Sequence, residues 1–465
     1  MKLLDTIAAI STPRGKGGVA MIRISGDNAL NIGDAVFFPR SKKKLSEYQS
    51  GKMAYGEIVM WGENRERYSI DDGLAVTFRA PASFTVEDTV EIYCHGGSLV
   101  TQKVLSCVLS AGARAAEAGE FTRRAFVNGK MSLNEAQSLG FLLEAKNDGQ
   151  LRVARGGMRG NLDKKTREIY ESLRDVMTNI FAVIDFPDED LSELSRDQMI
   201  SLVSGAKDKT DSLISTYGTG RAVIEGIPTV ICGRTNAGKS SVYNMILGYD
   251  AAIVTDIEGT TRDILREQAT LGSTTLLLCD TAGIRKTADT VESIGIDRAL
   301  TEIDTASLVL AVFDASGELC EDDLSLINTL KDGQKTCIAL LNKSDLLPNE
   351  RTVSTLKAAF EHVVFTSANK GEGSAELGSL IDKLFIDGNI DIDNDAIVTG
   401  ARQYAALKGA SGALCDSLEQ LKGGVPLDLC CIGIEAAMSA IGEVDGREIG
   451  EDIVAEIFSK FCVGK

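Results

Sequence analysis

Histidine, proline and long apolar runs are all scarce in this chain of 465 residues. It has two histidines, seven prolines and ten cysteines, and no two cysteines have the CxxC spacing. Because zinc sites are built mostly from closely spaced cysteine and histidine, this composition argues against a zinc cluster. Thiols in apolar strand-like runs, such as Cys232, Cys279 and Cys337, are typical of small core residues in a reducing compartment. We therefore expect a cytoplasmic protein.

The chain also lacks membrane signals and excess positive charge. No stretch approaches the roughly 18 consecutive apolar residues of a membrane span, and the first residues, MKLLDTIAAIST, contain Asp5 rather than the apolar core of a signal peptide. The formal net charge is −18. Because contact with phosphates depends on Lys and Arg patches, so acidic a chain is a poor general nucleic-acid binder. The basic run 42–44 is more typical of a solvated loop, so any RNA contact needs a local patch or a basic partner.

The length predicts about three domains. Residues 1–118 alternate strand-like runs with Gly and Pro turns, which predicts a small α+β domain. Residues 119–218 have helical spacing, residues 219–387 alternate apolar strands with helices, and residues 388–465 are helical again. The third pattern predicts a mostly parallel sheet. Helical segments on both sides indicate that this α/β domain is inserted into one helical domain; a fused tail of unrelated helices is the alternative.

The segment 233–240 has the pattern GxxxxGK[ST], and it stands between an apolar run and a helical pattern. This is the context of a phosphate-binding loop. Its glycines let backbone N–H groups wrap a pyrophosphate at a helix N-terminus, Lys239 meets the β- and γ-phosphates, and Ser240 offers a hydroxyl to Mg²⁺. A glycine-rich turn that caps an ordinary helix is the alternative, and the flanking pattern disfavours it.

Two further segments match the rest of such a site. An apolar run ends in Asp280-Thr-Ala-Gly283, a DxxG motif in which Asp280 reaches Mg²⁺ through water and the Gly283 N–H senses a γ-phosphate. Residues 255–263 lie between this motif and the phosphate loop, where a switch loop with a Mg²⁺-binding threonine is expected. A polar surface loop looks similar in isolation.

The base is selected by Asn342-Lys-Ser-Asp345. The Asp345 carboxylate can accept from both N1–H and the N2 amine of guanine, whereas adenine leaves a buried carboxylate unpaired. We expect Asn342 to help hold the base, Lys343 to lie along its face, and the loop 367–369 to donate to the guanine carbonyl. Five elements in this order predict GTP as the ligand. The predicted GTP-binding residues are Asn236, Ala237, Gly238, Lys239, Ser240, Ser241, Thr255, Asp256, Ile257, Glu258, Gly259, Thr260, Thr261, Asp280, Thr281, Ala282, Gly283, Asn342, Lys343, Asp345, Ser367, Ala368 and Asn369.

Hydrolysis needs groups that the motifs do not supply. Many small GTPases place a glutamine directly after DxxG to orient water, but this chain has Ile284 there. An obvious arginine finger is also missing, although Arg262 and Arg285 are candidates. Another group must therefore position the water and offset the developing negative charge.

Together with both flanks, these motifs resemble the tRNA modification GTPase family MnmE (TrmE) over essentially the whole chain. The resemblance is carried by residues 6–26, 83–97, 119–130 and the terminal Phe461-Cys-Val-Gly-Lys465. It implies an N-terminal α+β folate-binding domain, an all-α helical domain and an inserted Ras-like α/β GTPase domain. Two positions depart from the family: Glu258 stands where a small residue is frequent, and Val86 where glycine is common.

The resemblance implies a homodimer joined through the N-terminal domains, which bind a tetrahydrofolate one-carbon carrier (5-formyl- or methylene-tetrahydrofolate). A partner that carries the FAD, MnmG (GidA), would form a heterotetramer or larger complex with it and modify C5 of the wobble uridine of tRNA. Arg23, Glu91, Lys130 and Lys465 match the family's folate contacts; each alone is more typical of a surface salt bridge. Cys462 is a candidate catalytic thiol or a structural cysteine, and both readings stay open.

The resemblance also implies a potassium ion where other GTPases use arginine, with G domains that pair across their nucleotides. Such a cation offsets charge at the β–γ bridge much as an arginine does. Glu292 matches the catalytic, water-orienting glutamate, although alone it would be read as a solvated helix residue. The implied potassium ligands are Asn236, Thr255, Ile257 and Thr260, and the implied Mg²⁺ ligands are Ser240 and Thr261.

Two other functions fit parts of the sequence. A GTPase switch in ribosome or RNA assembly needs only the GTPase domain, but such proteins normally add a basic RNA-binding module, which is not visible here. The second alternative is a folate-binding regulatory module that has no role of its own in tRNA modification.

Overall fold

The computed structural model describes residues 5–13, 15–62, 66–185, 194–248, 267–278, 303, 306–332, 335–448 and 450–464. Backbone contacts divide the chain into two compact units. Unit 1 comprises Met1–Gly140 and Asp445–Lys465, and unit 2 comprises Phe141–Val444.

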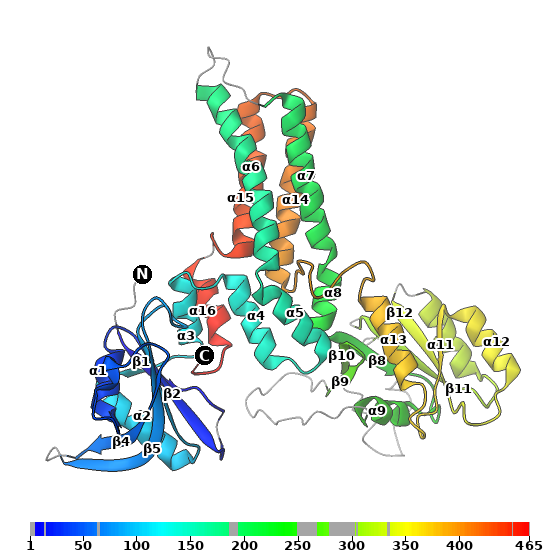
Figure 1. Cartoon of the computed structure of the whole chain (residues 1–465). Helices are drawn as coiled ribbons and strands as arrows, with labels where there is room; N and C mark the ends of the chain where they lie inside the picture. The colour runs from blue at the N-terminus through cyan, green and yellow to red at the C-terminus, as the bar shows by residue number, and fades with distance from the viewer. Residues whose placement is uncertain are drawn as a thin grey trace. The chain divides into compact units, whose positions relative to one another are not determined.

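Unit 1 is built on a seven-stranded sheet in the order β3-β4-β5-β6-β2-β1-β7 (Figure 1). Neighbouring strands run antiparallel, except for the parallel pair β1 and β7. The strands are β1 (Ile7–Ile10), β2 (Val19–Ser25), β3 (Phe37–Pro39), β4 (Met53–Trp61), β5 (Arg67–Phe78), β6 (Thr89–His95) and β7 (Arg114–Ala115).

The two faces of this sheet differ because successive side chains of a strand point to opposite sides. On one face, Ile22 and Ile24 of β2 are buried in a core shared with α1 (Ala29–Val36) and α2 (Ser98–Ser110). A short 3₁₀ turn, η1 (Leu45–Glu47), adds Leu45 to this core. The α+β pattern predicted for the N-terminal part is confirmed.

The C-terminal segment returns to unit 1. Phe458 of α16 (Glu451–Ser459) packs with Leu133, the first residue of α4 (Leu133–Glu144). Further on, Val463 forms an antiparallel bridge with Ala118. The contacts thus place the chain end with the sheet, whereas the domain bounds at 118, 218 and 387 stay predictions.

Four long helices of unit 2 form a bundle and run side by side in Figure 1. They share one hydrophobic core, in which Leu173 and Val203 come from before the α/β part of the chain and Leu414 and Ile434 from after it. One core built from both segments confirms the inserted arrangement and rules out a tail of unrelated helices. The helices are α6 (Asn161–Asp185), α7 (Arg196–Ser215), α14 (Ala401–Lys422) and α15 (Leu427–Asp445), with the shorter α5 (Asp148–Met158) and α8 (Tyr217–Ile224).

The α/β part of unit 2 has a six-stranded sheet in the order β13-β12-β11-β8-β10-β9. Its pairs are parallel except for the antiparallel β9. The apolar run of β11 is buried between two cores, one on each face, as expected for a parallel sheet covered by helices. The elements are β8 (Ile227–Cys232), α9 (Lys239–Gly248), β9 (Glu267–Leu271), β10 (Thr274–Leu278), β11 (Leu308–Asp314), α11 (Glu321–Asp332), β12 (Thr336–Asn342), α12 (Glu350–Ala359), β13 (His362–Phe365) and α13 (Ser374–Phe385).

The observed elements confirm the predicted fold class of α+β, all-α and inserted α/β parts. Among the described residues, no helix combines the length and the apolar character needed to cross a membrane.

Candidate functional site

The loop between β8 and α9 needs glycine at two positions. Gly233 and Gly238 have φ values of 143° and 101°, which side-chain-bearing residues rarely adopt. A Cβ on Gly233 would lie 2.3 Å from the carbonyl oxygen of Val312, and one on Gly238 would lie 2.0 Å from Nδ2 of Asn342. The loop therefore runs directly against β11 and the end of β12.

The Lys239 side chain lies inside this loop and holds two of its carbonyl groups. Its Nζ donates to the carbonyl oxygens of Gly233 and Arg234, each at 2.9 Å. Burial lowers the pKa of Lys239, since the charged form has lost part of its solvation. An anion in the loop, at the N-terminus of α9, would restore favourable electrostatics to this ammonium. Ser240 is exposed at the start of the same helix.

Asn236 is exposed and has a left-handed backbone with φ 64°. Asparagine adopts this conformation more readily than most residues other than glycine. The backbone alone thus gives a reason for asparagine at this position, separate from any bound cation.

Asn342 joins two loops through its side-chain amide. It ends β12 and is 3% exposed. Nδ2 donates to the Ala237 carbonyl oxygen at 3.0 Å, and Oδ1 accepts from the Ala368 N–H at 3.1 Å. The amide therefore ties the phosphate loop to the loop after β13, a role that the motif does not reveal.

Asp345 and Lys343 are held by neighbours. Asp345 is exposed, and its Oδ1 accepts from Ser367 Oγ at 2.8 Å. That hydrogen bond lowers the pKa of Asp345, which keeps the carboxylate ionised, as guanine recognition requires. Lys343 has φ 62°, and its Nζ donates to Asp314 Oδ2 at 2.6 Å.

Those predicted nucleotide residues that the structure describes lie together at the carboxyl ends of β8, β12 and β13. They are residues 236–241, Asn342, Lys343, Asp345 and residues 367–369. The other predicted nucleotide, metal and catalytic residues lie outside the described part of the chain: Thr255, Asp256, Ile257, Glu258, Gly259, Thr260, Thr261, Asp280, Thr281, Ala282, Gly283 and Glu292.

In unit 1, Arg23 of β2 and Glu91 of β6 are paired across the sheet. Arg23 Nε donates to Glu91 Oε1 at 3.0 Å, and the Tyr93 hydroxyl donates to Glu91 Oε2 at 2.6 Å. The guanidinium carbon of Arg23 lies 5.4 Å from the ring centroid of Phe84 and 5.7 Å from that of Phe121. Two predicted folate residues therefore form one mostly buried ion pair, with the rings of Phe84 and Phe121 beside the guanidinium.

The other two predicted folate residues, Lys130 and Lys465, and the separate candidate Cys462 lie near the end of α3 (Glu120–Val127) or at the chain end. Lys130 is exposed after α3, and Cys462 is exposed while its carbonyl oxygen accepts from the Gly119 N–H at 3.4 Å. Lys465 lies outside the described residues. Just before it, the Gly464 carbonyl oxygen accepts from Ser11 Oγ at 2.9 Å, which fixes the chain end beside β1.

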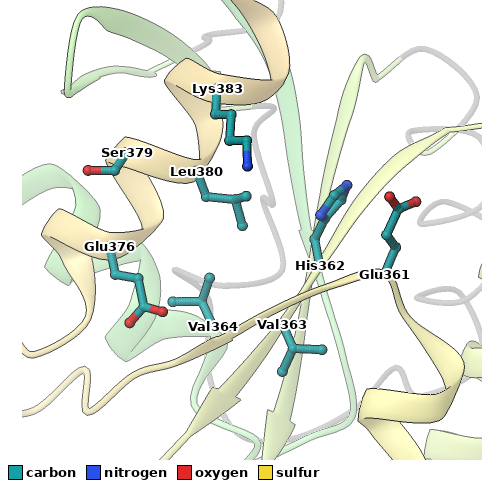
Figure 2. A pocket seen from close by; sticks show the side chains of 8 residues that line it. All are labelled: Glu361, His362, Val363, Val364, Glu376, Ser379, Leu380 and Lys383. Atoms are coloured by element: carbon teal, nitrogen blue, oxygen red, sulfur yellow. The ribbon is translucent and has the colours of Figure 1, made fainter.

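A separate pocket of about 350 Å³ lies between β13 and α13 (Figure 2). In Figure 2, His362, Val363 and Val364 lie along the strand, and the facing helix carries Glu376 and Lys383. His362 begins β13, whereas the nucleotide loops follow the ends of the strands. The pocket is therefore distinct from the nucleotide site. Its lining is Glu361, His362, Val363, Val364, Glu376, Ser379, Leu380 and Lys383.

A glycine-dependent phosphate loop with its internal lysine, and a guanine-type aspartate beside it on a parallel sheet, define a P-loop GTPase. Residues 6–130 match the family model "GTP-binding protein TrmE N-terminus", and residues 133–462 match "MnmE helical domain". The chain therefore belongs to the tRNA modification GTPase MnmE family, as the sequence resemblance predicted.

Curated relatives agree with this assignment along the whole chain. The tRNA modification GTPase MnmE of Acetivibrio thermocellus is 38% identical over 464 residues, which cover 99% of each chain. That of Lactobacillus helveticus is 39% identical over 461 residues, covering 99% of this chain and 98% of the relative. A solved G domain of the T. maritima FeoB iron transporter aligns with 24% identity and a TM-score of 0.24 over 33% of this chain and 96% of that one.

Proposed function

We propose that this chain is the potassium-activated, GTP-hydrolysing subunit of a tRNA-modifying complex. The complex adds an aminomethyl-type (carboxymethylaminomethyl) group to C5 of the wobble uridine, with a tetrahydrofolate one-carbon unit and an FAD-carrying MnmG partner. One observation carries the proposal: Asn342 ties the phosphate loop to the base loop in a chain whose two flanks match the MnmE family.

The cation part of the proposal rests on Asn236. An amide oxygen is a suitable ligand for a hard cation, and this residue is exposed on the phosphate loop. Held there, the cation would offset charge that develops between the β- and γ-phosphates. Ser240, exposed at the start of α9, fits a hydroxyl ligand of Mg²⁺. Glu292 would orient the attacking water, a task that Ile284 cannot perform.

GTP turnover in potassium and in sodium at equal ionic strength tests the cation. Wild type should turn over much faster in potassium. Asn236→Gly removes the amide without straining the left-handed backbone, so it should lose the potassium stimulation and keep its affinity for GDP. Asn236→Ala adds a backbone penalty of about 1 kcal/mol and is the less clean variant. Equal wild-type rates in the two salts would refute the proposal that potassium activates hydrolysis.

The homodimer is supported by exposed apolar side chains on the β4–β5 hairpin. Tyr55 and Leu74 face each other in register, and Met53 lies on the same side of the sheet, two residues away. All three are exposed, and so apolar a strip is typical of a surface that another chain covers. Light scattering should therefore give a dimer mass for wild type and a monomer mass for Tyr55→Arg.

Two measurements test the folate and tRNA parts in turn. The first is binding of 5-formyl- and methylene-tetrahydrofolate to wild type and Lys130→Ala by calorimetry. The second is mass spectrometry of wobble uridine after the protein and its flavoprotein partner are added to unmodified tRNA. Folate binding without modification would favour a regulatory module, and GTP hydrolysis without either would favour an assembly switch. The net charge of −18 is consistent with tRNA contact supplied largely by the partner.

A further inference from the structure

The segment between β11 and α11 contacts both nucleotide loops. It begins at Asp314, the last residue of β11, and reaches Asp323 in the first turn of α11. Each carboxylate is paired with a cationic side chain of a different nucleotide loop. Neither aspartate belongs to the motifs that identify the GTP site.

Asp314 holds Lys343 of the base loop. Its Oδ2 accepts from Lys343 Nζ at 2.6 Å, and its Oδ1 accepts from the N–H and hydroxyl of Ser316 at 3.0 and 2.6 Å. Burial opposes ionisation of Asp314, but these hydrogen bonds outweigh it and lower its pKa. The carboxylate is thus a fixed anion against which the Lys343 ammonium is placed.

Asp323 holds Arg234 of the phosphate loop. The carboxylate is 2% exposed, and its Oδ2 lies 3.2 Å from Arg234 Nε. This contact is an ion pair without hydrogen-bond geometry, since Arg234 Nε is buried and makes no hydrogen bond to the described residues. Asp323 Oδ2 also accepts from the Cys320 N–H at 3.1 Å, whereas Oδ1 is buried without a hydrogen-bond partner among the described residues. A buried carboxylate is costly unless it is paired with a cation, so the ion pair with Arg234 offsets the burial of Asp323 and fixes where the arginine lies.

Backbone contacts fasten the segment between the two anions. The Ala315 N–H donates to the Asn342 carbonyl oxygen at 2.9 Å, and the Ala315 carbonyl oxygen accepts from the Asn349 N–H at 2.8 Å. Thr352 Oγ1 donates to the Gly317 carbonyl oxygen at 2.8 Å. The two carboxylates therefore sit on a rigid support and not on a loose loop.

We infer that Asp314 and Asp323 are positioning residues for GTP: they fix Lys343 and Arg234, and so preset the base loop and the phosphate loop relative to each other. The inference rests on GTP binding at this site. A preset site binds more tightly because less ordering of side chains and loops remains to be done when the ligand arrives. Long cationic side chains gain most, since they lose the most rotamer freedom.

The first test is GDP affinity, measured with a fluorescent GDP analogue. Asp314→Asn and Asp323→Asn keep the shape of each side chain and remove its charge. Each should weaken GDP binding about tenfold, the scale of a lost charge-assisted hydrogen bond for Asp314 and of a broken buried ion pair for Asp323. Asp322→Asn is the matched control, because Asp322 is the exposed neighbour in the same helical turn, and it should bind within twofold of wild type.

Double-mutant cycles separate positioning from general structural damage. If Asp314 acts through Lys343, then Asp314→Asn should have almost no further effect in a Lys343→Met background, and Asp323→Asn almost none in Arg234→Met. Full additivity in both cycles would overturn the inference. Arg234→Lys, which keeps the charge, should restore part of the affinity lost in Arg234→Met; no recovery would count against the pair.

The controls also separate this inference from the proposed function. Thermal unfolding without nucleotide identifies any variant that fails to fold, and the Arg234 variants then test the same pair from its other side. If wild type itself did not bind GDP or GTP, the proposed function would fail before the cycles were measured.

Discussion

Replacing Asn342 by alanine tests the link between the phosphate loop and the base loop. The amide donates to the Ala237 carbonyl oxygen and accepts from the Ala368 N–H, and the side chain is buried. Alanine removes the amide, which leaves both the Ala237 carbonyl oxygen and the Ala368 N–H without this partner. We expect nucleotide affinity to fall, because the two loops are no longer held together.

The size of the effect follows from the two groups left behind. A buried polar group without a partner costs about 1–3 kcal/mol. Two such groups set an upper range of about 2–6 kcal/mol, and water that enters the vacated space reduces this to about 2–4 kcal/mol. Since 1.4 kcal/mol is a factor of ten, GDP should bind roughly 30- to 1000-fold more weakly. The preference for guanine over hypoxanthine should survive, because we expect Asp345 and not Asn342 to meet the 2-amino group.

The assay is calorimetric titration with GDP and with IDP. Asn389→Ala is the control: Asn389 is an exposed asparagine that follows α13, and its amide donates to Asp387 Oδ1 at 3.1 Å and not to a nucleotide loop. It should leave both affinities unchanged. A GDP affinity of Asn342→Ala within threefold of wild type would refute the link, and a loss of guanine preference would show that this amide contacts the base.

Two further predictions concern unit 1. Glu120 is 3% exposed and accepts hydrogen bonds from Arg114 and Arg124. Burial opposes its ionisation, but the arginines lower its pKa below that of an ordinary glutamate. Its stabilisation is therefore complete above the ordinary glutamate pKa and is lost as pH falls through the lowered value. Glu120→Gln should therefore cost about 1–3 kcal/mol at neutral pH, because Arg124 keeps its pairs with Asp5 and Glu87. In a plot of the unfolding free energy against pH, the acid side should become flatter; an unchanged slope would contradict this. Val86 has φ 65°, so Val86→Gly should raise the unfolding free energy in urea by about 1 kcal/mol, and no gain would argue against strain there.

The sequence predicts the nucleotide loops well because the ligand's chemistry restricts residue types at fixed spacing. A pyrophosphate needs backbone N–H groups and glycines, and the structure indeed gives Gly233 and Gly238 positive φ values and no room for a Cβ. The inserted domain was also predictable, since helical spacing recurs on both sides of the α/β pattern. At position 86 the structure explains a family preference that the sequence showed only as a departure. The backbone there is left-handed, which glycine adopts without strain.

The supporting residues could not be predicted in this way. Asp322 and Asp323 both read as ordinary acids in the first turn of a helix, where they favour the N-terminal end of the dipole. Only the fold shows that Asp322 is exposed and Asp323 is 2% exposed beside Arg234. Likewise Asp314 ends an apolar strand without any motif of its own. Their roles depend on how strands that are separate in the sequence pair and in which register. The local spacing of residues does not predict that pairing.

The pairing of Arg23 with Glu91 changes how a folate would be recognised. Each Glu91 oxygen already accepts a hydrogen bond, one from Arg23 and one from Tyr93. Burial and Glu91 raise the pKa of Tyr93 to about 12, so its hydroxyl stays a donor at neutral pH. A pterin edge must therefore add to the remaining lone pairs of Glu91 and cannot simply replace its partners. Because the Arg23–Glu91 pair is neutral overall, a bound folate would need an exposed cation to attract its glutamate carboxylates. Among the described residues predicted to contact folate, Lys130 is exposed and would fit this role.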